Sequence, residues 1–556
     1  MDKELALLAS PLQDWVQSQQ WKKFQPIQRE SIRAILQDAS DTNDFILSSM
    51  TASGKTEAAF LPILTKIHNR DEHGRPSFEI LYISPLKALI NEMIGRVKGM
   101  AARVERQAYR RHGDVTGKER SGSRGILLTT PESLEAQFIR SADDLAFAFR
   151  DLQAVIIDEI HAYFESPRGP QLISLLTRLE TLLAQEHNRN EYHIQRIALS
   201  ATVSSQNSEG QESLKIFLRP DKPERVKILC PEVNGNNPTR IYLKVFRDLK
   251  KGMDSLPHDA HVQQTLIREP GDINLPDLPA AINQITRSLF DVFSNCHKGL
   301  IFTNSRREAE DFAELLNQRA REKGLVKEPK GLDDNFSTKT RLFWPHHGSL
   351  DSSIRSLAEK IMRDKEQQSI LVCTTTLELG IDIGMVEATA QIGSGYSVAS
   401  LRQRLGRSGR REGMVPTLHA YVRESDLGED AHVLDRLHLQ IFRTLARIHL
   451  LEQGAFEPPD LQRLNPSTLI QQLLSCIHQF QEGDGLDPEF ARLLFVDRGP
   501  FKSAERPFMP LIDHLSKKYK PLIEKQKDHL FLTELGGKYA EHFTFYAAFH
   551  LSITHI

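Results

Sequence analysis

Short apolar runs alternate with longer periodic segments twice along the chain, and this alternation constrains the fold most strongly. In the first 220 residues the runs are bounded by Gly, Pro, Ser or acidic residues, and a looser stretch from about 205 to 295 separates them from the second set. Strands that alternate with helices form parallel βαβ units, so the sequence predicts two tandem parallel-sheet α/β lobes. The expected strands are residues 45–49, 79–84, 125–130, 154–158 and 196–200 in the first lobe, and residues 299–304, 341–347, 369–374 and 388–393 in the second.

After about residue 425, helical patterns replace the strand signals, so the sequence predicts a mainly helical C-terminal region. Residues 437–454 and 466–483 are amphipathic and end at glycine, which commonly terminates helices. Further on we expect a helix near 509–520 and a hairpin near 529–540, with Leu535–Tyr539 forming its turn. The predicted domains are residues 1–225, 226–430 and 431–556.

The composition is that of a globular protein, with 40% hydrophobic and 26% charged residues. No apolar run approaches the roughly 18–20 residues that span a bilayer, and the N-terminus lacks the pattern of a signal peptide. We therefore expect no membrane association and a cytoplasmic location. The four cysteines form no C-x-x-C pair, which excludes a zinc ribbon. The net charge of −2 disfavours a passive nucleic-acid coat.

A loop that suits phosphate binding follows the first expected strand, with the sequence Ser49-Met-Thr-Ala-Ser-Gly-Lys-Thr56. Its backbone N–H groups, including those of Ser53 and Gly54, and the following helix N-terminus would face nucleotide phosphates. Lys55 would contact the β- and γ-phosphates, and the Thr56 hydroxyl would bind Mg²⁺. The strict pattern has Gly in place of Ser49, but a small residue still permits the tight turn. A simple Gly-containing turn is the alternative interpretation.

An acidic pair, Asp158-Glu159, ends the fourth expected strand. The carboxyl ends of parallel strands form the ligand-binding edge of such a sheet. Asp158 can hold Mg²⁺ through water there, and Glu159 can polarise the attacking water. An acidic turn after a strand is a common alternative, but together with the loop at 49–56 the pair favours nucleotide hydrolysis.

Five arginines lie within residues 401–411, near the end of the second lobe. The Gly-Arg-x-Gly-Arg spacing brings Arg407 and Arg410 onto one side of a turn, which suits a γ-phosphate across a cleft. Such an arginine finger raises hydrolysis rates by roughly 10³ or more in other enzymes, and it would make hydrolysis depend on lobe closure. A solvated basic face is the alternative.

In this order and at these distances, the three segments resemble motifs I, II and VI of superfamily 2 helicases of the DEAD/DEAH-box type. The resemblance implies two RecA-like lobes and the cofactors ATP and Mg²⁺. Gln28 would read the adenine edge, and His161 would couple the nucleotide site to motif III. Gly380, Asp382 and Gln403 would contribute to nucleotide binding from the second lobe. The other matching segments are 24–28 (Q-motif), 84–89 (Ia), 129–133 (Ib), 200–202 (III), 301–306 (IV) and 374–382 (V).

Longer strings are similar to the large helicase-related (Lhr) group. Members of that group are DNA-dependent ATPases that move 3′ to 5′ on single strands, with a winged-helix domain after the second lobe, which the resemblance implies for residues 466–540. They carry a further domain beyond it, whereas this sequence ends shortly after. A short variant, a truncated copy, and one half of an assembly in which a protein partner supplies a C-terminal domain or a nuclease are the alternatives. The strings are residues 82–92, 111–137, 155–180, 346–360 and 376–411.

Motifs Ia, Ib, IV and V carry the nucleic-acid contacts that the resemblance implies. Their hydroxyl and amide groups would hold the phosphodiester backbone, which suits sequence-independent stepping. For each side chain a strand-end cap is the alternative. Lysines within 517–527 would lie along DNA or form a solvated face. The expected contacts are Ser84, Thr129, Thr130, Asn304, Thr374 and Thr375, with Arg111 and His112 near the same edge.

Three functions fit these features. The first is a 3′-to-5′ helicase or translocase on single-stranded or tailed duplex DNA. The second is a helicase for RNA or RNA:DNA hybrids, because the same motifs grip either backbone. The third is a nucleotide-dependent switch, or an ATP-driven component of a DNA repair or anti-phage defence assembly. Intact Lys55, Glu159, Arg407 and Arg410 argue against an inactive ATPase, and we favour the first function.

Overall fold

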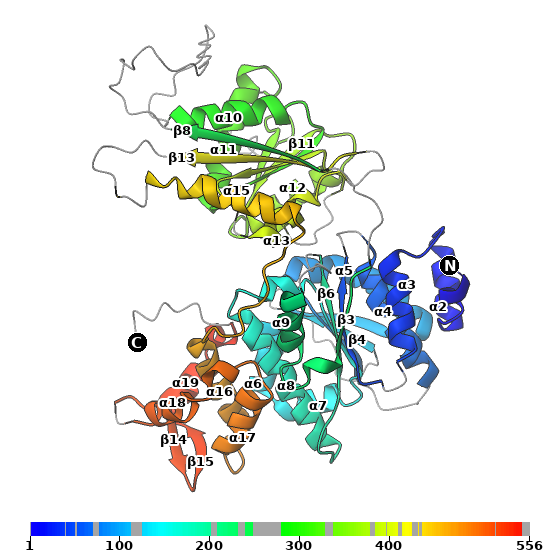
Figure 1. Cartoon of the computed structure of the whole chain (residues 1–556), viewed down its shortest axis with the longest axis vertical. Coiled ribbons are helices and arrows are strands. Elements are labelled where there is room, and N and C mark those ends of the chain that lie inside the picture. Colours follow the sequence, from blue (N-terminus) through cyan, green and yellow to red (C-terminus); the bar gives the residue numbers. More distant parts are fainter. Residues whose placement is uncertain are drawn as a thin grey trace. The chain divides into compact units, whose positions relative to one another are not determined.

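The computed structural model divides into two compact units (Figure 1). One comprises Met1–Asn234 together with Ala455–Ile556, and the other comprises Gly235–Gly454. Residues 431–556, which the sequence groups as one region, are therefore divided between the two units at Gly454. The structure describes residues 2–38, 41–49, 53–70, 77–112, 125–201, 208–231, 239–247, 280–327, 337–378, 384–395, 397–409, 414–424, 432, 436–517 and 519–547.

The first unit contains a seven-stranded sheet in the order β3-β4-β2-β5-β6-β1-β7, and all of its pairings are parallel. The five predicted strands are present, and their bounds differ from the prediction by no more than one residue at either end. The two strands that the sequence did not predict, β3 and β7, lie at the sheet edges, where partial exposure removes the continuous apolar signal. The strands are β1 (Asp44–Ser48), β2 (Phe78–Ile83), β3 (Gln107–Arg111), β4 (Gly125–Thr129), β5 (Ala154–Ile157), β6 (Gln195–Ser200) and β7 (Val226–Leu229).

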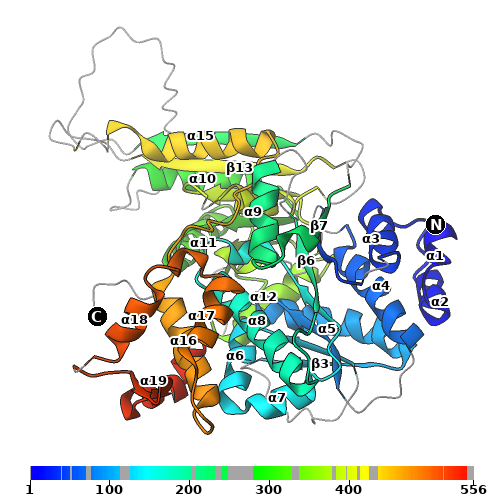
Figure 2. The same ribbon diagram turned by 60° about the horizontal axis from the view of Figure 1, so that its bottom comes forward.

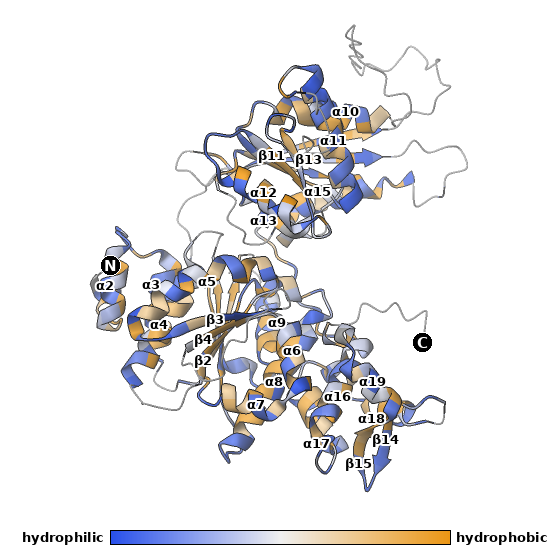
Figure 3. Ribbon diagram, turned by 180° about the vertical axis from the view of Figure 1, so that it is seen from behind, coloured by the Kyte–Doolittle hydropathy of each residue, from blue (hydrophilic) through white to orange (hydrophobic). Residues whose placement is uncertain are grey.

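Helices cover both faces of this sheet, because successive strand residues point to opposite sides. Ile80 and Tyr82 join the core beneath α2–α5, whereas Leu81 and Ile83 join the core beneath α6–α9. Figure 3 shows the hydrophobic character along the strands between these layers. The helices are α2 (Ser10–Ser18), α3 (Pro26–Leu36), α4 (Lys55–Arg70), α5 (Lys87–Ala101), α6 (Pro131–Arg140), α7 (Ala142–Ala148), α8 (Arg168–Glu186) and α9 (Ser208–Leu218).

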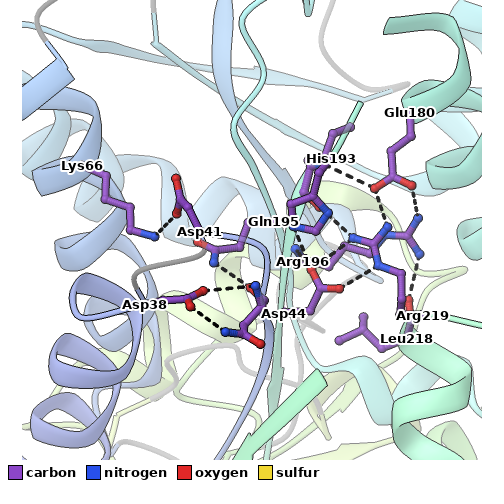
Figure 4. Close-up of polar contacts among 12 residues, drawn as sticks. Asp38, Asp41, Asp44, Lys66, Glu180, His193, Gln195, Arg196, Leu218 and Arg219 are labelled. Carbon is purple, nitrogen blue, oxygen red and sulfur yellow. Dashed lines mark hydrogen bonds and ion pairs between the residues drawn. The ribbon is translucent and has the colours of Figure 1, made fainter. Parts of the chain in front are cut away.

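A buried ion-pair network fastens α8 and α9 to the amino-terminal ends of the central strands (Figure 4). Arg219 donates from Nε to Asp44 Oδ2 and from Nη1 to Glu180 Oε1, each at 2.7 Å. Arg196 donates to Glu180 Oε2, also at 2.7 Å. Each buried charge thus has an opposite partner that offsets its desolvation. The network therefore holds together the amino-terminal ends of these strands. The predicted motifs lie at the opposite, carboxyl-terminal ends.

The second unit contains a six-stranded parallel sheet in the order β10-β11-β9-β12-β13-β8. The four predicted strands are present with bounds within two residues of the prediction. The looser stretch from about 205 to 295 contains four elements that were not predicted from the sequence, namely α9, β7, β8 and α10. The edge strand β8 has no fully buried residue, and Arg240, Lys244 and Arg247 leave it only short apolar segments, so it gives no long apolar signal. The elements are β8 (Arg240–Arg247), β9 (Lys298–Phe302), β10 (Phe343–His346), β11 (Ser369–Cys373), β12 (Ala388–Ile392), β13 (Thr417–Glu424), α10 (Ala280–Phe293), α11 (Arg306–Glu322), α12 (Ser352–Arg363), α13 (Val398–Leu405) and α15 (Leu439–Glu452).

The C-terminal part of the first unit is a small helical body with one hairpin. The predicted turn at Leu535–Tyr539 is wrong, because these residues lie in α19, which Thr533 caps by accepting from Gly536 N. The hairpin turns instead at Lys527 and Asp528, whose φ angles of 48° and 69° suit a tight antiparallel turn. The elements are α16 (Pro466–Phe480), α17 (Pro488–Arg492), α18 (Phe508–Leu515), β14 (Ile523–Gln526), β15 (His529–Leu532) and α19 (Glu534–Glu541).

This body docks on α6 and α8 through buried polar contacts, and α16 lies beside both helices (Figure 2). Arg178 of α8 donates to Glu135 at 3.2 Å and to Ser475 Oγ at 3.1 Å, and its guanidinium also stacks on Phe138. Gln472 donates to the other oxygen of Glu135. Because satisfied buried polar groups hold defined geometry, the C-terminal body and the first sheet form one packed unit.

Single-turn helices connect several of these elements. Among the described residues, none of the helices combines the length and apolar character needed to cross a membrane. The short helices are α1 (Asp2–Leu5), η1 (Ala102–Val104), η2 (Ile160–Tyr163), η3 (Pro223–Arg225), η5 (Thr375–Leu377), η6 (Leu493–Asp497), η7 (Lys502–Ala504) and η8 (Phe543–Tyr546).

Candidate active site

The predicted phosphate loop and acidic pair converge at the carboxyl ends of neighbouring strands of the first sheet. The loop follows β1, the acidic pair follows β5, and β6 lies between these two strands. Lys55 is the first residue of α4, so its backbone N–H lies at a helix N-terminus, where anions bind favourably. Residues 50–52 of the loop lie outside the described residues.

Gly54 has a conformation that a larger residue could not adopt. Its φ is +77°, and a Cβ at this position would lie 2.2 Å from Gln28 Nε2. The Lys55 ammonium donates to Ser49 O at 2.6 Å, which folds the loop back on itself. The Thr56 side chain is buried, and Ser53 Oγ has no hydrogen-bond partner among the described residues. A phosphate ligand would satisfy that hydroxyl.

Gln28 lies against the loop and is held from two sides. Its Nε2 donates to Gly54 O at 3.3 Å, and its Oε1 accepts from Gln25 N at 2.9 Å at the start of α3. The contact with adenine therefore stays a prediction, whereas the contact with the phosphate loop is present.

The acidic pair is buried and held in a defined conformation. Asp158 N donates to Ile83 O at 2.8 Å, Asp158 Oδ1 accepts from Glu159 N at 3.0 Å, and Asp158 Oδ2 accepts from the Tyr82 hydroxyl at 2.5 Å. Glu159 has φ +45° and ψ +51°, a left-handed conformation that costs about 1–3 kcal/mol in a residue other than glycine. Such strain is concentrated at functional sites.

His161 lies between the acidic pair and the end of β6. Its Nε2 is 3.6 Å from Glu159 Oε2, and its Nδ1 is 3.4 Å from Ser200 Oγ. His161 thus contacts both the acidic pair and motif III, and its coupling role stays a prediction. Thr202, in the same motif as Ser200, lies outside the described residues.

The buried charges of the site favour the binding of a cation together with an anion. Burial lowers the pKa of Lys55, and the charges of Glu159 and Asp158 oppose that shift. Burial and repulsion from Glu159 raise the pKa of Asp158, against the Tyr82 hydrogen bond and the Lys55 charge. Two buried carboxylates so close together are stabilised in their charged form by a bound cation.

The oxygen donors present fit Mg²⁺. The Thr56 hydroxyl and the Asp158 carboxylate are hard ligands, and Mg²⁺ in nucleotide sites is held by one or two such groups with waters and phosphates. In the described part of the chain no group of three or more His, Cys, Asp or Glu side chains forms a metal cage. The site therefore suits a metal ion that arrives with phosphates.

In the second unit the arginine-rich segment is only partly described. Arg407 is buried and donates to Glu378 O at 2.7 Å, and Arg404 pairs with the Glu378 carboxylate at 2.6 Å. Gln403 is buried in α13. Gly380, Asp382 and Arg410 lie outside the described residues, so their predicted roles stay predictions.

The predicted nucleic-acid contacts of the first unit lie at the ends of β2 and β4. Thr129 donates to Arg111 O at 2.8 Å, and Thr130 caps α6 by accepting from Ser133 N, so both hydroxyls already have protein partners. Ser84 Oγ is buried and has no hydrogen-bond partner in the described ranges. Thr130 thus caps the helix that follows β4, and nucleic-acid binding at these residues stays a prediction.

The corresponding residues of the second unit lie at the ends of β9 and β11. Asn304 donates from Nδ2 to Ser394 O at 3.3 Å. Thr374 is half-buried directly after β11, and Thr375 is exposed at the start of η5. Of these three side chains, Thr375 is the most accessible to a nucleic-acid strand.

Tyr82 and two ion pairs at the site were missed from the sequence. Glu57 of α4 pairs with Arg96 of α5, and Glu132 of motif Ib pairs with Arg168 at 2.6 Å. The signal for Tyr82 was a hydroxyl within a mostly apolar buried strand, because such a hydroxyl requires a partner.

Comparison with known proteins identifies two helicase domains in the chain. The family model described as DEAD/DEAH box helicase matches residues 25–209, and the model described as helicase conserved C-terminal domain matches residues 281–412. The chain is 30% identical over 414 residues to the Lhr helicase/uracil glycosylase of Escherichia coli (strain K12), which covers 68% of this chain and 25% of that protein. It is 27% identical over 429 residues to the ATP-dependent helicase Lhr-Core protein 2 of Thermococcus barophilus, which covers 74% of this chain and 43% of that protein.

The fold has a solved counterpart in the Mycobacterium smegmatis helicase Lhr bound to ssDNA and AMP-PNP. That structure aligns with a TM-score of 0.69 and 23% identity, covering 97% of this chain and 62% of that chain. The chain therefore spans less than half of the two curated relatives and less than two thirds of the solved one. The two helicase models, matched in order on two parallel-sheet lobes, show that the chain belongs to the superfamily 2 helicases of the DEAD/DEAH-box type and resembles the Lhr helicases.

Proposed function

We propose that this chain hydrolyses ATP with Mg²⁺ and uses the reaction to move 3′ to 5′ along single-stranded DNA. The observation that carries the proposal is the buried Asp158-Glu159 pair, at a strand end two strands away from the loop that holds Lys55. DNA as the track is supported by the resemblance to Lhr, one member of which has been solved on ssDNA. A helicase acting on RNA is the competing possibility.

Each residue of the site has a distinct role in this proposal. Lys55 releases Ser49 O and neutralises the β- and γ-phosphates, while Thr56 and Asp158 hold Mg²⁺. The metal ion supplies positive charge to the developing negative charge on the phosphates. Glu159 orients the attacking water. His161 transmits a change in the Glu159 carboxylate to Ser200, because it contacts both residues.

In this proposal the second unit contributes positive charge at the nucleotide and contacts to the nucleic-acid backbone. Arg407 and Arg410 would contact the terminal phosphate and stabilise its charge during transfer, so hydrolysis would require both units. The hydroxyl and amide groups of motifs Ia, Ib, IV and V would hold the phosphodiester backbone without reading bases. Alternate gripping by the two units then advances the protein along the strand.

Steady-state ATPase activity tests the proposal with no nucleic acid, with single-stranded DNA and with single-stranded RNA. Lys55→Ala is the control for contaminating ATPases, because it removes the phosphate contact. We expect strong stimulation by DNA, followed by unwinding of duplexes with 3′ tails and not of duplexes with 5′ tails. Stimulation by RNA alone would assign the track to RNA, and no activity with either would contradict the motor function of this chain.

A further inference from the structure

We propose that Tyr82 is a positioning residue for Asp158, the carboxylate assigned above to Mg²⁺, and that it acts from the neighbouring strand. The inference rests on the proposed ATPase function. It adds a residue that lies outside the phosphate loop and the acidic pair.

The contact follows from the parallel register of two central strands. Tyr82 of β2 is paired with Ile156 of β5, and Ile83 is paired with Ile157. Asp158 is therefore the first residue beyond the paired segment, and its N–H donates to Ile83 O at 2.8 Å. The Tyr82 side chain reaches past the strand end and donates its hydroxyl hydrogen to Asp158 Oδ2 at 2.5 Å.

The two oxygens of Asp158 thus have different surroundings. Oδ2 accepts from Tyr82, and Oδ1 accepts from Glu159 N at 3.0 Å. The two hydrogen bonds fix the carboxylate plane, and each oxygen retains a lone pair for a metal-bound water. Outer-shell partners of this kind orient metal ligands and tune their affinity.

The Tyr82 ring is itself immobilised against the phosphate-loop helix. Its side chain is fully buried, and it stacks on Phe60 of α4 with ring centroids 5.9 Å apart and an interplanar angle of 27°. The same helix begins with Lys55 and Thr56. Tyr82 therefore ties the carboxylate that ends β5 to the helix that carries the phosphate ligands.

Tyr82→Phe removes the hydroxyl and keeps the ring against Phe60. Tyr192→Phe is the matched control, because the Tyr192 hydroxyl donates to Leu152 O at 3.1 Å, just before the opposite end of β5. The probe is fluorescent N-methylanthraniloyl-ATP, titrated first in EDTA and then with increasing Mg²⁺, and the melting temperature of each variant is recorded. This measurement reports binding and does not require turnover.

In EDTA, Tyr82→Phe should bind the probe with the same affinity as wild type. In the Mg²⁺ titration it should require about tenfold more Mg²⁺ to reach half of the Mg²⁺-dependent change in binding, which is typical of substitutions next to a metal ligand. The ATPase rate should recover at high Mg²⁺. Tyr192→Phe should show no such shift. An unchanged Mg²⁺ requirement in a folded Tyr82→Phe protein would overturn the proposal.

A double-mutant cycle separates positioning from a general effect on folding. In the Asp158→Asn background, Tyr82→Phe should add no further change in the Mg²⁺ requirement, because its partner is already altered. Additive effects would mean that Tyr82 acts on the core and not through Asp158. If wild-type protein binds the probe without any dependence on Mg²⁺, the proposed function fails, whereas dependence that Tyr82→Phe leaves unchanged refutes only the role of Tyr82.

Discussion

The imidazole of His161 lies 3.4 Å from the hydroxyl of Ser200, which joins the segment after β5 to the end of β6. The other ring nitrogen faces Glu159 at 3.6 Å. A change in the Glu159 carboxylate can therefore reach β6 through a single side chain. In a protein that couples hydrolysis to movement, such a contact suits a coupling residue better than a proton carrier.

His161→Ala should uncouple ATP hydrolysis from its stimulation by single-stranded DNA. The basal ATPase rate should remain near wild type, while stimulation by single-stranded DNA should fall about tenfold, within the range of roughly 0.5–2 kcal/mol for residues that modulate coupling. Ser200→Ala should have the same effect, and the double variant should be no worse than either single one. Loss of basal hydrolysis in His161→Ala would instead assign the imidazole to the chemical step.

Glu159→Gln should slow hydrolysis without preventing nucleotide binding. Loss of the water-orienting base should reduce kcat by about 10²–10⁴-fold, the usual contribution of such a group. The affinity for fluorescent ATP should stay close to that of wild type, since the phosphate contacts remain. The exposed Glu165 offers the same substitution as a control. Unchanged turnover in Glu159→Gln would refute the assigned role.

Most strands of the two sheets could be predicted because buried parallel strands are continuous apolar runs, whereas β3, β7, β8 and β13 were not predicted. The residues after β1 and β5 could then be placed at one edge of the first sheet. The contact between Tyr82 and Asp158 could not be predicted from the sequence. These residues are 76 positions apart, and only the pairing of β2 with β5 brings them together. Strand order is a property of the whole sheet, and one sequence does not encode it locally.

The C-terminal region shows the same limit at longer range. Helix α16 was predicted within residues 466–483 and spans Pro466–Phe480, but its docking on α6 depends on Gln472 and Glu135, which are 337 positions apart. The hairpin turn was misplaced because the glycine pair at 536–537 gave the stronger turn signal. Lys527 and Asp528 adopt positive φ in the structure, which their residue types only weakly favour.

Glu135→Ala should loosen the C-terminal body. Arg178 would then keep a buried charge without its carboxylate partner, which destabilises proteins by about 3–5 kcal/mol. Calorimetry should show a lower unfolding temperature, or a separate early transition for residues 455–547. Glu534→Ala breaks an exposed pair with Lys538 in the same body and should leave the unfolding temperature nearly unchanged. Equal effects of the two substitutions would contradict the docking role of Glu135.

The network around Glu180 should give the protein a specific sensitivity to acid. Burial would raise the pKa of Glu180, but the charges of Arg196 and Arg219 outweigh it and lower the pKa from 4.5 to about 2. A carboxyl group with a lowered pKa in the folded state stabilises the fold above its unfolded pKa, and the stabilisation is lost as the pH falls from about 4.5 toward 2. A shift of this size corresponds to a contribution on the order of 3 kcal/mol at neutral pH.

Urea unfolding of wild type and Glu180→Gln as a function of pH checks this contribution. At pH 7 the variant should be less stable, because two buried guanidiniums lose a negative partner. The difference in unfolding free energy should shrink as the pH falls from about 4.5 toward 2, because Glu180 of the unfolded wild type takes up a proton in this range, whereas folded Glu180 does so only near pH 2. Glu186→Gln, at the exposed end of the same helix, should show no such convergence. A difference that stays constant down to acid pH would mean that the amide disturbs packing and that the Glu180 charge does not hold the network together.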